Sequence, residues 1–265
     1  MSHGGCVRCG IRYAARDRRE AVVRSWAARL SGRTSYAHMY RLVDRLPLCS
    51  GCLEEMPVIG ETICEQCGRS WEHQGEPFLL ESGSLRCRDC RSLGESALGG
   101  NRGLLRYDDW GKDLLGLYKY RGDERLADFF GKLLTLAMYR YFRPGQFDYL
   151  VAVPLHPKRL NERGFNQMES IAGRLSRAIG VPAQNALIRT KETAKLSQQT
   201  GREVRIHSMK DAFAWKGEAA HPKKPSRILL LDDIYTTGST LRACAQAIHH
   251  VETVKSYIWS LTIYR

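Results

Sequence analysis

Apolar residues beyond position 98 follow two alternating patterns along the chain. Helical spacing marks residues 110–120, 125–142, 165–179 and 240–249. Continuous apolar runs mark residues 148–154 and 227–231, and a run rich in β-branched and aromatic residues marks 254–263. Strands that alternate with helices are typical of βαβ units, which build a parallel sheet flanked by helices. The pattern therefore predicts an α/β domain, with a charged and poorly periodic segment at 189–207.

The first 98 residues show a different pattern, in which pairs of cysteines are separated by short polar segments. An arginine-rich stretch at 13–46 interrupts these pairs, and apolar residues within it lie at helical spacing, so we expect one or two amphipathic helices there. Glycine and serine are concentrated at 92–102, which indicates a linker or a surface crossing. We therefore predict a first domain at 1–98, with a helical insertion at about 13–46, and a second domain at 99–265.

The composition is that of a globular protein of one or two domains. Of the 265 residues, 43% are apolar and 26% are charged. No stretch approaches the roughly 18 apolar residues of a membrane span, and no apolar run follows Met1, so we expect a cytoplasmic protein. The net charge is +13, of which residues 1–100 contribute +2 and residues 101–265 contribute +11. This basic excess favours polyanionic partners such as phosphates or nucleic acid.

Eight of the nine cysteines form four Cys-x-x-Cys pairs. The pairs are Cys6/Cys9, Cys49/Cys52, Cys64/Cys67 and Cys87/Cys90. A single pair is also compatible with a redox dithiol, but four pairs between polar connectors in a reducing compartment predict two structural zinc sites of four thiolates each. The spacing leaves the pairing open, because the gap of 11 residues between the second and third pairs favours a site built from those two. The ninth cysteine, Cys244, lies on the apolar face of a predicted helix, and we expect it in the core.

The most specific local motif spans residues 228–240. A continuous apolar strand ends there in two adjacent carboxylates, Asp232 and Asp233, and a turn then opens a helix. The N-terminus of a helix offers unpaired N–H groups and the positive end of its dipole to a phosphate. The residues that add hydroxyl groups and a glycine to this cradle are Thr236, Thr237, Gly238, Ser239 and Thr240. Because the carboxylates can accept hydrogen bonds from a sugar diol, the motif predicts a ribose 5-phosphate site; the alternative is a strand-to-helix turn with an Asp cap.

Residues 228–240 also match the phosphoribosyl pyrophosphate (PRPP) signature of type I phosphoribosyltransferases at every position. Further matching segments are residues 119–123, 151–155 and 162–167, together with Arg159. With the four cysteine pairs, these motifs give the chain a resemblance to the ComF family of competence proteins over essentially its whole length. The resemblance implies a type I phosphoribosyltransferase-like domain behind a small double zinc ribbon. It also implies consecutive zinc pairing, with Cys6/Cys9 joined to Cys49/Cys52 and Cys64/Cys67 joined to Cys87/Cys90.

The resemblance implies a role for each matched position of the second domain. Asp232 and Asp233, the candidate catalytic residues, would hold the ribose hydroxyls of PRPP, and residues 236–240 would hold its 5-phosphate. The residues implied on the pyrophosphate side, after the strand that ends at residue 153, are Lys158, Arg159 and Arg163. Magnesium would accompany PRPP. Three cations after a parallel strand agree with this placement, since ligands of open α/β sheets bind at the carboxyl ends of the strands; a solvated loop charge is the alternative for Arg163.

Three features of this region have alternative interpretations. His156 and Tyr235 flank the predicted crevice, where they either take up a proton or serve only in packing or face solvent. Gln167 is either a ligand or the cap of the helix that Phe165 opens. The segment 189–205 corresponds to a hood over the site in the family, but it reads Thr193-Ala-Lys-Leu where the family has Thr-x-x-Gln, so the resemblance defines no contacts there.

Two functions agree with the resemblance. One is an enzyme of natural competence and DNA uptake that transfers phosphoribosyl from PRPP to an acceptor that the sequence does not name. The other is a non-catalytic protein that binds single-stranded DNA and partner proteins and uses the cradle as a ligand sensor. The family implies the ComFA helicase and the recombination mediator DprA as partners. Arginines beside the cysteines, with Tyr13 and Trp71 for base stacking, are compatible with DNA contact by the ribbons, although the near-neutral charge of this half favours a structural or protein-docking role.

Overall fold

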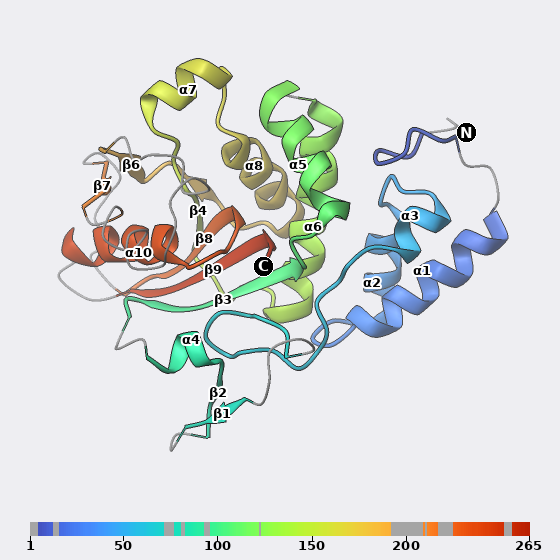
Figure 1. Cartoon of the computed structure of the whole chain (residues 1–265), viewed down its shortest axis with the longest axis horizontal. Helices are drawn as coiled ribbons and strands as arrows, with labels where there is room; N and C mark the ends of the chain where they lie inside the picture. The colour runs from blue at the N-terminus through green and yellow to red at the C-terminus, as the bar shows by residue number, and fades with distance from the viewer. Residues whose placement is uncertain are drawn as a thin grey trace.

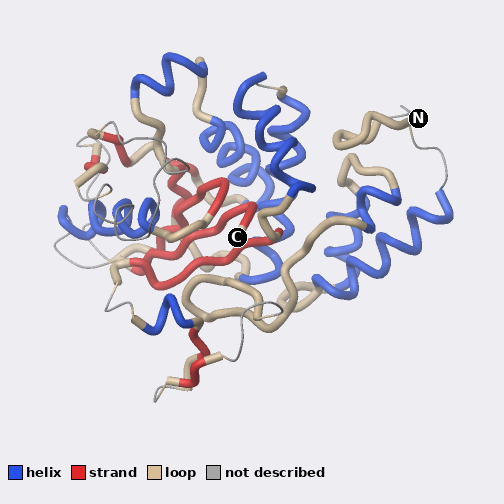
Figure 2. Tube along the Cα trace, viewed as in Figure 1, coloured by secondary structure: helices blue, strands red, loops and turns tan. Residues whose placement is uncertain are grey.

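A five-stranded parallel sheet forms the centre of the molecule. The computed structural model describes residues 5–12, 16–71, 77–80, 83–92, 96–121, 123–191, 209, 211–216, 225–251 and 256–265. The strands are β3 (Leu98–Leu105), β4 (Tyr149–Ala152), β5 (Ala183–Gln184), β8 (Arg227–Ile234) and β9 (Tyr257–Tyr264). Their order is β3-β9-β8-β4-β5, and every neighbouring pair is parallel. Figure 1 and Figure 2 show helices around these central strands, so the predicted α/β architecture is confirmed.

Both faces of the sheet are buried, as the continuous apolar run of β8 predicts for a central parallel strand. Leu229 and Leu231 belong to one core, with α6 (Glu124–Tyr141) and α8 (Gln167–Ile179). Ile228 and Leu230 belong to a second core, with α10 (Ser239–Val251). Because side chains alternate along a strand, successive residues of β8 stabilise opposite layers. Helix α5 (Asp109–Arg121) adds Leu114, Leu115 and Tyr118 to the first core.

The chain between β4 and α8 forms a helix, although the apolar pattern marks no element between residues 154 and 165. Helix α7 (Pro157–Arg163) begins after His156, whose Nδ1 accepts the backbone N–H of Lys158 at 3.3 Å. Proline in its first turn and Gly164, with a φ of 75°, at its C-terminal end fix the two limits of α7. Helix α8 has Asn166 as its N-cap. The suggestion that Gln167 caps this helix is therefore wrong, because Asn166 supplies the side-chain acceptor.

The first helices are continuous with the core of the sheet domain. They are α1 (Arg16–Leu30), α2 (Tyr36–Asp44) and α3 (Ser50–Glu54), so the expected helices within 13–46 are present, while residues 13–15 lie outside the described residues. Leu30, Met39 and Leu53 are fully buried in the same core as α6. Figure 1 shows α1, α2 and α3 beside α6. The boundary proposed at residues 98 and 99 falls at the first residue of β3, and the division into two domains stays a prediction.

The second cysteine region packs against the edge strand β3, where the backbone N–H of Asn101 donates to the carbonyl oxygen of Gln66. It contains a short hairpin of β1 (Phe78–Leu79) and β2 (Leu85–Arg86), followed by α4 (Arg88–Arg91). Cys64, Cys67, Cys87 and Cys90 belong to the same core as Ile228, Leu230 and α10. In Figure 1 the hairpin extends away from the sheet beyond α4. This cysteine region is thus attached to the sheet through its four cysteines and not through the hairpin.

A separate two-stranded sheet lies against α10. Its strands, β6 (Leu187–Arg189) and β7 (Phe213–Trp215), are antiparallel. The predicted hood falls almost wholly within residues 192–208, which lie outside the described residues. Among the helices of the described residues, none has the length and apolar character needed to cross a membrane.

Candidate functional site

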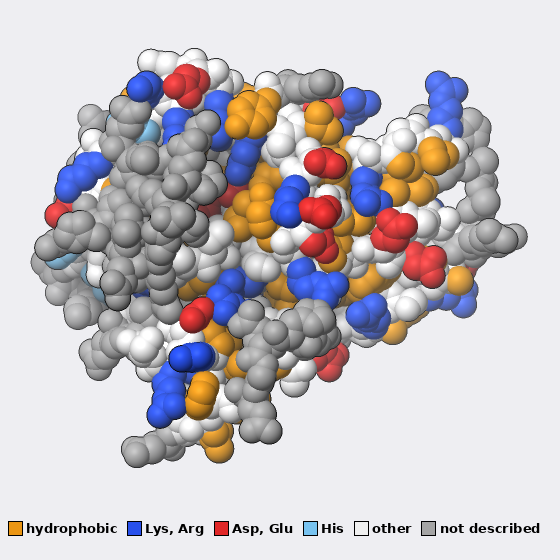
Figure 3. Space-filling model, in the orientation of Figure 1, with side chains coloured by type: hydrophobic (Ala, Val, Ile, Leu, Met, Phe, Trp, Pro, Cys, Tyr) orange, Lys and Arg blue, Asp and Glu red, His pale blue; other side chains and the backbone are white. Residues whose placement is uncertain are grey.

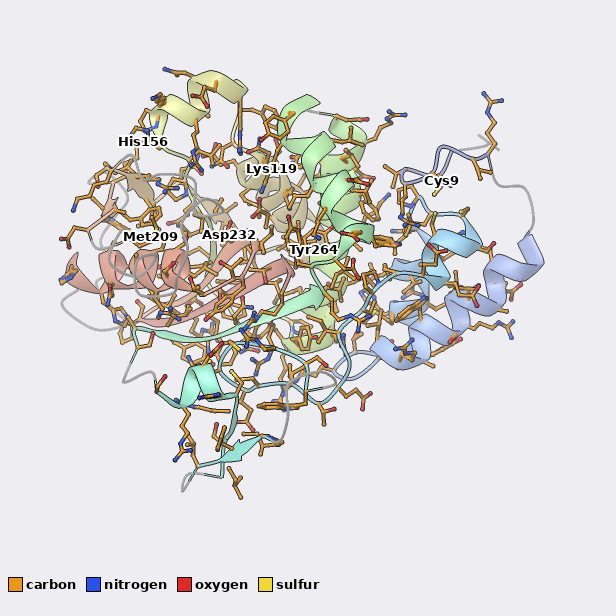
Figure 4. The ribbon with its side chains drawn as sticks, in the orientation of Figure 1. Cys9, Lys119, His156, Met209, Asp232 and Tyr264 are labelled. Carbon is orange, nitrogen blue, oxygen red and sulfur yellow. The ribbon has the colours of Figure 1, made fainter. Side chains whose placement is uncertain are left out.

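The two carboxylates of the predicted cradle lie at the carboxyl end of β8. The Oδ1 atom of Asp232 accepts the backbone N–H of Asp233 at 2.9 Å. The carboxylate of Asp233 forms an ion pair with Nζ of Lys119, which lies in the last turn of α5. Both side chains are largely buried, with exposed fractions of 23% for Lys119 and 19% for Asp233. Figure 4 shows Lys119 and Asp232 at the same end of the strands, so α5 brings a cation to the carboxylate pair.

Opposing electrostatic effects act on Asp232. Burial raises the pKa of Asp232 to about 7, and the charge of Asp233 adds to the rise. The charges of Lys119 and Arg189 act in the opposite direction. Burial lowers the pKa of Arg189, which ends β6, and the charge of Arg159 lowers it further. Strongly perturbed pKa values beside opposite charges are typical of functional sites, and here three cations accompany two carboxylates.

The raised pKa of Asp232 predicts that the fold loses stability as the pH rises. An unfolded Asp ionises near pH 4, whereas folded Asp232 keeps its proton until about pH 7. Between these values Asp232 binds more protons in the folded state than in the unfolded state, so its own contribution to the free energy of unfolding decreases by about 2 to 4 kcal/mol from pH 4 to pH 8. Asp232→Asn has no such titration. Urea unfolding at pH 5 and pH 8 measures this effect. The free energy of unfolding of the variant, relative to that of the wild type, should be higher at pH 8 than at pH 5. An equal difference at both pH values would contradict the effect of burial on Asp232.

Residues 235–240 connect β8 to α10 and contain the predicted phosphate-binding residues, so we call them the phosphate loop. Gly238 has a φ of 73°, a conformation that L side chains rarely adopt. The hydroxyls of Thr237 and Ser239 lie 3.0 Å apart, and the Thr237 hydroxyl also accepts the backbone N–H of Ser239 at 3.4 Å. The guanidinium of Arg242 donates to the carbonyl oxygen of Thr237 at 2.6 Å. These contacts shape a tight turn at the N-terminus of a 13-residue helix, which is the arrangement that favours a bound phosphate.

Tyr235 and His156 both have structural contacts, as their packing interpretation predicts. Only 4% of Tyr235 is exposed, and its hydroxyl accepts a hydrogen bond from Arg242 at 3.3 Å. Burial raises the pKa of Tyr235 to about 12, which disfavours proton loss near neutral pH. His156 uses its Nδ1 to cap α7. The geometry therefore gives no support to proton transfer by either residue.

The residues expected on the pyrophosphate side separate into different environments. Arg159 lies close enough to Arg189 to lower the pKa of that residue. Arg163 donates to Oε1 of Gln167 at 3.2 Å, and Gln167 donates in turn to the backbone carbonyl of Lys119 at 3.3 Å. Lys158 is exposed on α7. Arg163 is thus linked through Gln167 to the residue that pairs with Asp233, which a solvated loop charge would not be.

The roles of Lys119 and Arg189 are not predicted from the sequence. Lys119 belongs to the matched segment 119–123, but nothing in its spacing indicates a contact with a carboxylate more than a hundred residues later. Arg189 stands at the start of a charged segment, where the sequence gives no sign that it is buried. The sequence does indicate that Lys119 lies near the end of a helix, because Gly122 and Asp123 follow it.

The eight paired cysteines form two four-sulfur clusters. Cys6, Cys9, Cys49 and Cys52 make the first cluster, and Cys64, Cys67, Cys87 and Cys90 make the second, with the ligand atoms of each within 4.8 Å of one another. The consecutive pairing that the resemblance implies is confirmed, and the pairing favoured by the 11-residue gap is wrong. The long gap is filled by α1 and α2, which bring the first two pairs together. Cys244 is fully buried in the core, as expected.

The donor sets of both clusters fit structural zinc, which prefers four thiolates in a closed tetrahedral site. Although burial raises it, backbone N–H groups of Cys9, Cys49 and Arg8 lower the pKa of Cys6 to about 7. Hydrogen bonds from the other three thiols of the second cluster lower the pKa of Cys67, and the charge of Arg265 lowers it further. Donors that favour a thiolate at a sulfur also favour a metal ligand there. The second cluster is fully buried, whereas Cys9 of the first cluster is exposed.

Several arginines beside the cysteines have partners within the protein. Arg8 pairs with Glu55 at 2.7 Å, and Arg69 pairs with Asp89 at 2.8 Å. The guanidinium of Arg91 lies over the ring of Phe78, 4.7 Å from its centroid. These contacts agree with a structural role of the cysteine regions. Among the described residues on the face that Figure 3 shows, Lys and Arg side chains are interspersed with Asp and Glu.

Known relatives place the chain in a family. No family model matches it. It is 31% identical over 195 residues to competence protein ComFC of Streptococcus pneumoniae, a match that covers 73% of this chain and 77% of that protein. The chain belongs to the ComFC competence-protein family. Within that family it is also 29% identical over 206 residues to competence protein ComFC of Bacillus subtilis, with 76% of this chain and 77% of that protein covered.

More distant relatives of this ComFC family member include the DNA utilization protein YhgH of Escherichia coli K12. The identity is 26% over 221 residues, which cover 81% of this chain and 89% of that protein. Among solved structures, adenine phosphoribosyltransferase from Leishmania donovani aligns with 55% of this chain and 68% of its own, at 12% identity and a TM-score of 0.31.

Proposed function

We propose that this ComFC family member binds PRPP with magnesium at the carboxyl end of β8 and transfers its phosphoribosyl group to an acceptor during DNA uptake. One observation carries the proposal: Asp232 and Asp233 end a buried parallel strand directly before a glycine turn and the N-terminus of α10, with Lys119 paired to Asp233. A sugar diol next to a phosphate matches this order of carboxylates and helix N–H groups.

Each part of PRPP has complementary groups in this site. The two carboxylates accept hydrogen bonds from the ribose hydroxyls, and the phosphate loop donates N–H and hydroxyl groups to the 5-phosphate. Arg159, with Lys158 and Arg163 on the same helix, supplies positive charge on the pyrophosphate side. Magnesium, when bound with PRPP, would neutralise charge on the departing pyrophosphate. The reaction needs position and charge more than a protein nucleophile, since a ribosyl cation develops as pyrophosphate leaves.

Lys119 has two roles in this proposal. In the structure it neutralises Asp233, which keeps a buried carboxylate stable without ligand. When the ribose hydroxyls bind Asp233, the ammonium group of Lys119 becomes available to the pyrophosphate oxygens. The link from Arg163 through Gln167 to the Lys119 backbone holds the end of α5 at this place.

The biological setting comes from the relatives, which are named competence and DNA utilization proteins. We therefore place the chain in the cytoplasm at DNA uptake, with single-stranded DNA, a ComFA-type helicase and DprA as partners. The alternative is a non-catalytic protein that binds DNA and partners and uses PRPP as a signal. The cradle supports both forms of the proposal, whereas the internal contacts of the arginines at the cysteine clusters favour a structural role for those clusters.

At pH 8, above the pKa of Asp232, Asp232→Asn/Asp233→Asn is expected to weaken Mg-PRPP binding by at least about 100-fold, because each carboxylate contributes a charge-assisted hydrogen bond of roughly 1.5 to 3 kcal/mol. Calorimetric titration of zinc-loaded protein measures this, with affinity in the micromolar range expected for the wild type, on the order of 8 kcal/mol. The same samples are assayed for pyrophosphate release and for single-stranded DNA binding, which the variant should keep or improve because it has lost negative charge.

The matched control is Asp128→Asn/Asp148→Asn, which removes the same charge from two exposed ion pairs away from the site. Asp128 lies on α6, and Asp148 precedes β4 at the amino end of the strand. The control should bind Mg-PRPP like the wild type. Equal binding by both double variants, or no binding by the wild type, would reject the PRPP site. PRPP binding without pyrophosphate release over a panel of acceptors would favour the non-catalytic form.

A further inference from the structure

Arg265 connects the second four-cysteine cluster to the phosphate loop. Its Nε donates to the carbonyl oxygen of Cys67 at 2.7 Å, and its NH2 group lies 2.9 Å from the Sγ of Cys67. Its NH1 group lies 3.4 Å from the carbonyl oxygen of Tyr235 and 3.5 Å from that of Thr236. The guanidinium also lies over the Tyr235 ring, 4.8 Å from its centroid. One planar side chain thus contacts a metal-ligand sulfur and the first residues of the phosphate loop.

The sheet holds both ends of this connection. On the cluster side, the backbone N–H of Asn101 in β3 donates to the carbonyl oxygen of Gln66 at 2.8 Å, and the Asn101 amide donates to that of Cys67 at 3.3 Å. On the loop side, the backbone N–H of Tyr235 donates to the carbonyl oxygen of Tyr264 at 3.0 Å. Arg265 itself donates its backbone N–H to Leu105 at 2.8 Å. The positions of the knuckle, the arginine and the loop are therefore fixed relative to one another.

The chemistry of the acceptors makes this contact dependent on the state of the cluster. A guanidinium has five donors and no acceptor, so it is stabilised by carbonyl oxygens and by negative charge. A cysteine sulfur is negative and fixed in direction when it is a metal-ligand thiolate, and hydrogen bonds to such ligands tune metal affinity. Four thiolates around one divalent ion keep net negative charge beside Arg265. The same guanidinium thus contacts the cluster sulfur through NH2 and the two loop carbonyl oxygens through NH1.

Arg8 makes a similar contact at the first cluster without such a connection. Its NH1 group lies 3.6 Å from the Sγ of Cys52 and 2.7 Å from the carboxylate of Glu55. Its guanidinium stands over the ring of Trp110, 5.3 Å from the centroid. None of these described contacts involves residues 235–240. Arg8 is therefore a matched control for Arg265: its guanidinium contacts a cluster sulfur, but the described contacts do not link it to the phosphate loop.

We infer that Arg265 is a positioning residue that couples the second four-cysteine cluster to the phosphate loop, so that a metal-loaded cluster favours the loop conformation that receives a phosphate. The part of this inference that concerns PRPP depends on the proposed function. By thermodynamic reciprocity, a ligand in the loop must then stabilise the metal in the second cluster to the same degree. The first cluster should show no such effect.

The first experiment needs no PRPP and compares zinc-loaded wild type, Arg265→Ala and Arg8→Ala by amide hydrogen exchange. Peptides that cover residues 235–240 should exchange about 10-fold faster in Arg265→Ala, because local opening of the loop becomes easier. Peptides from α6 should be unchanged, which shows that the variant is folded. Arg8→Ala should have the wild-type exchange in the loop. A loop in Arg265→Ala that exchanges as in the wild type would overturn the inference.

The second experiment follows zinc release to a chromogenic chelator. We expect a fast phase from the first cluster, where Cys9 is exposed, and a slow phase from the buried second cluster. Arg265→Ala should accelerate only the slow phase, by about 10- to 100-fold, and Arg8→Ala only the fast phase. Arg265→Lys keeps the charge but lacks the planar fork, so it should restore zinc retention and leave the loop exchange fast.

Addition of Mg-PRPP tests the coupling directly. It should slow the slow phase of zinc release in the wild type and in Arg8→Ala, and leave it unchanged in Arg265→Ala. An equal effect of Mg-PRPP on all three proteins would show that coupling bypasses Arg265 and would overturn the inference. If the wild type does not bind Mg-PRPP at all, the proposed function fails, and the hydrogen-exchange comparison alone decides the role of Arg265.

Discussion

If the second cluster holds zinc, as its four cysteines predict, Cys67→Ser is expected to lower the free energy of unfolding by about 4 kcal/mol or more and to remove one zinc ion per chain, because it deletes one of the four ligands inside a core. Only 1% of Cys67 is exposed, and the second cluster shares its core with Ile228 and Leu230 of β8. The variant would leave three buried thiols and a buried hydroxyl without the metal that four cysteines would share. Urea unfolding followed by circular dichroism, with zinc content measured on the same samples, checks both effects.

Cys9→Ser is the matched control for this expectation, since it deletes one ligand from the first cluster. Cys9 is exposed and belongs to a short segment held to the chain by hydrogen bonds such as that from Val7 to Pro47, at 2.9 Å. We expect loss of one zinc ion but a decrease in the free energy of unfolding of only about 1 to 2 kcal/mol. Equal unfolding midpoints for the two variants would show that the second cluster is no more important to the core than the first.

The architecture could be predicted because its signals are local. The continuous apolar run of β8 indicates a strand that is buried on both faces. The helical periods of α5, α6, α8 and α10 indicate helices that are buried on one face. Both patterns can be recognised without knowing which element packs against the strand or helix. Helix α7 was missed because it is short and polar, with no buried residue, so it has no apolar period. Its signals are those of its ends, Pro157 in the first turn and Gly164 after the last.

The site was only partly predictable, because ion pairs between distant segments leave no periodic trace in a sequence. The order of carboxylates, glycine and hydroxyls in residues 232–240 is contiguous, and the chain itself places these groups together. Lys119 contacts Asp233 only because α5 ends near the carboxyl end of β8. Arg265 contacts Cys67 only because the cysteine knuckle packs on β3. The pairing of the cysteines likewise depends on α1 and α2. The number of residues between Cys9 and Cys49 does not give the distance between these cysteines, because the two helices fold that segment back on itself.

Gly238→Ala is expected to weaken Mg-PRPP binding by about 100-fold, because displacing the loop donors by about 1 Å removes their alignment with a phosphate. Gly238 has a φ of 73°, and a Cβ added there would overlap the Tyr235 hydroxyl and lie 2.8 Å from the guanidinium of Arg242. Both side chains are held, Tyr235 by burial and Arg242 by its hydrogen bond to Thr237 at 2.6 Å. The loop itself must therefore move. Calorimetric titration of Mg-PRPP into the zinc-loaded variant measures the loss.

Gly180→Ala separates the effect of backbone conformation from that of the overlap. Gly180 has nearly the same φ, 71°, but a Cβ there meets nothing within 4 Å, and the residue caps the far end of α8. An L residue in this left-handed conformation costs about 1 to 2 kcal/mol, so both variants should lose that amount of folding stability. Gly238→Ala should lose a further 1 to 3 kcal/mol or so from the overlap, and it alone should lose PRPP affinity. Wild-type affinity in a folded Gly238→Ala protein would mean that the turn before α10 does not hold the phosphate, and the ligand would then have to be sought among the cations of α7.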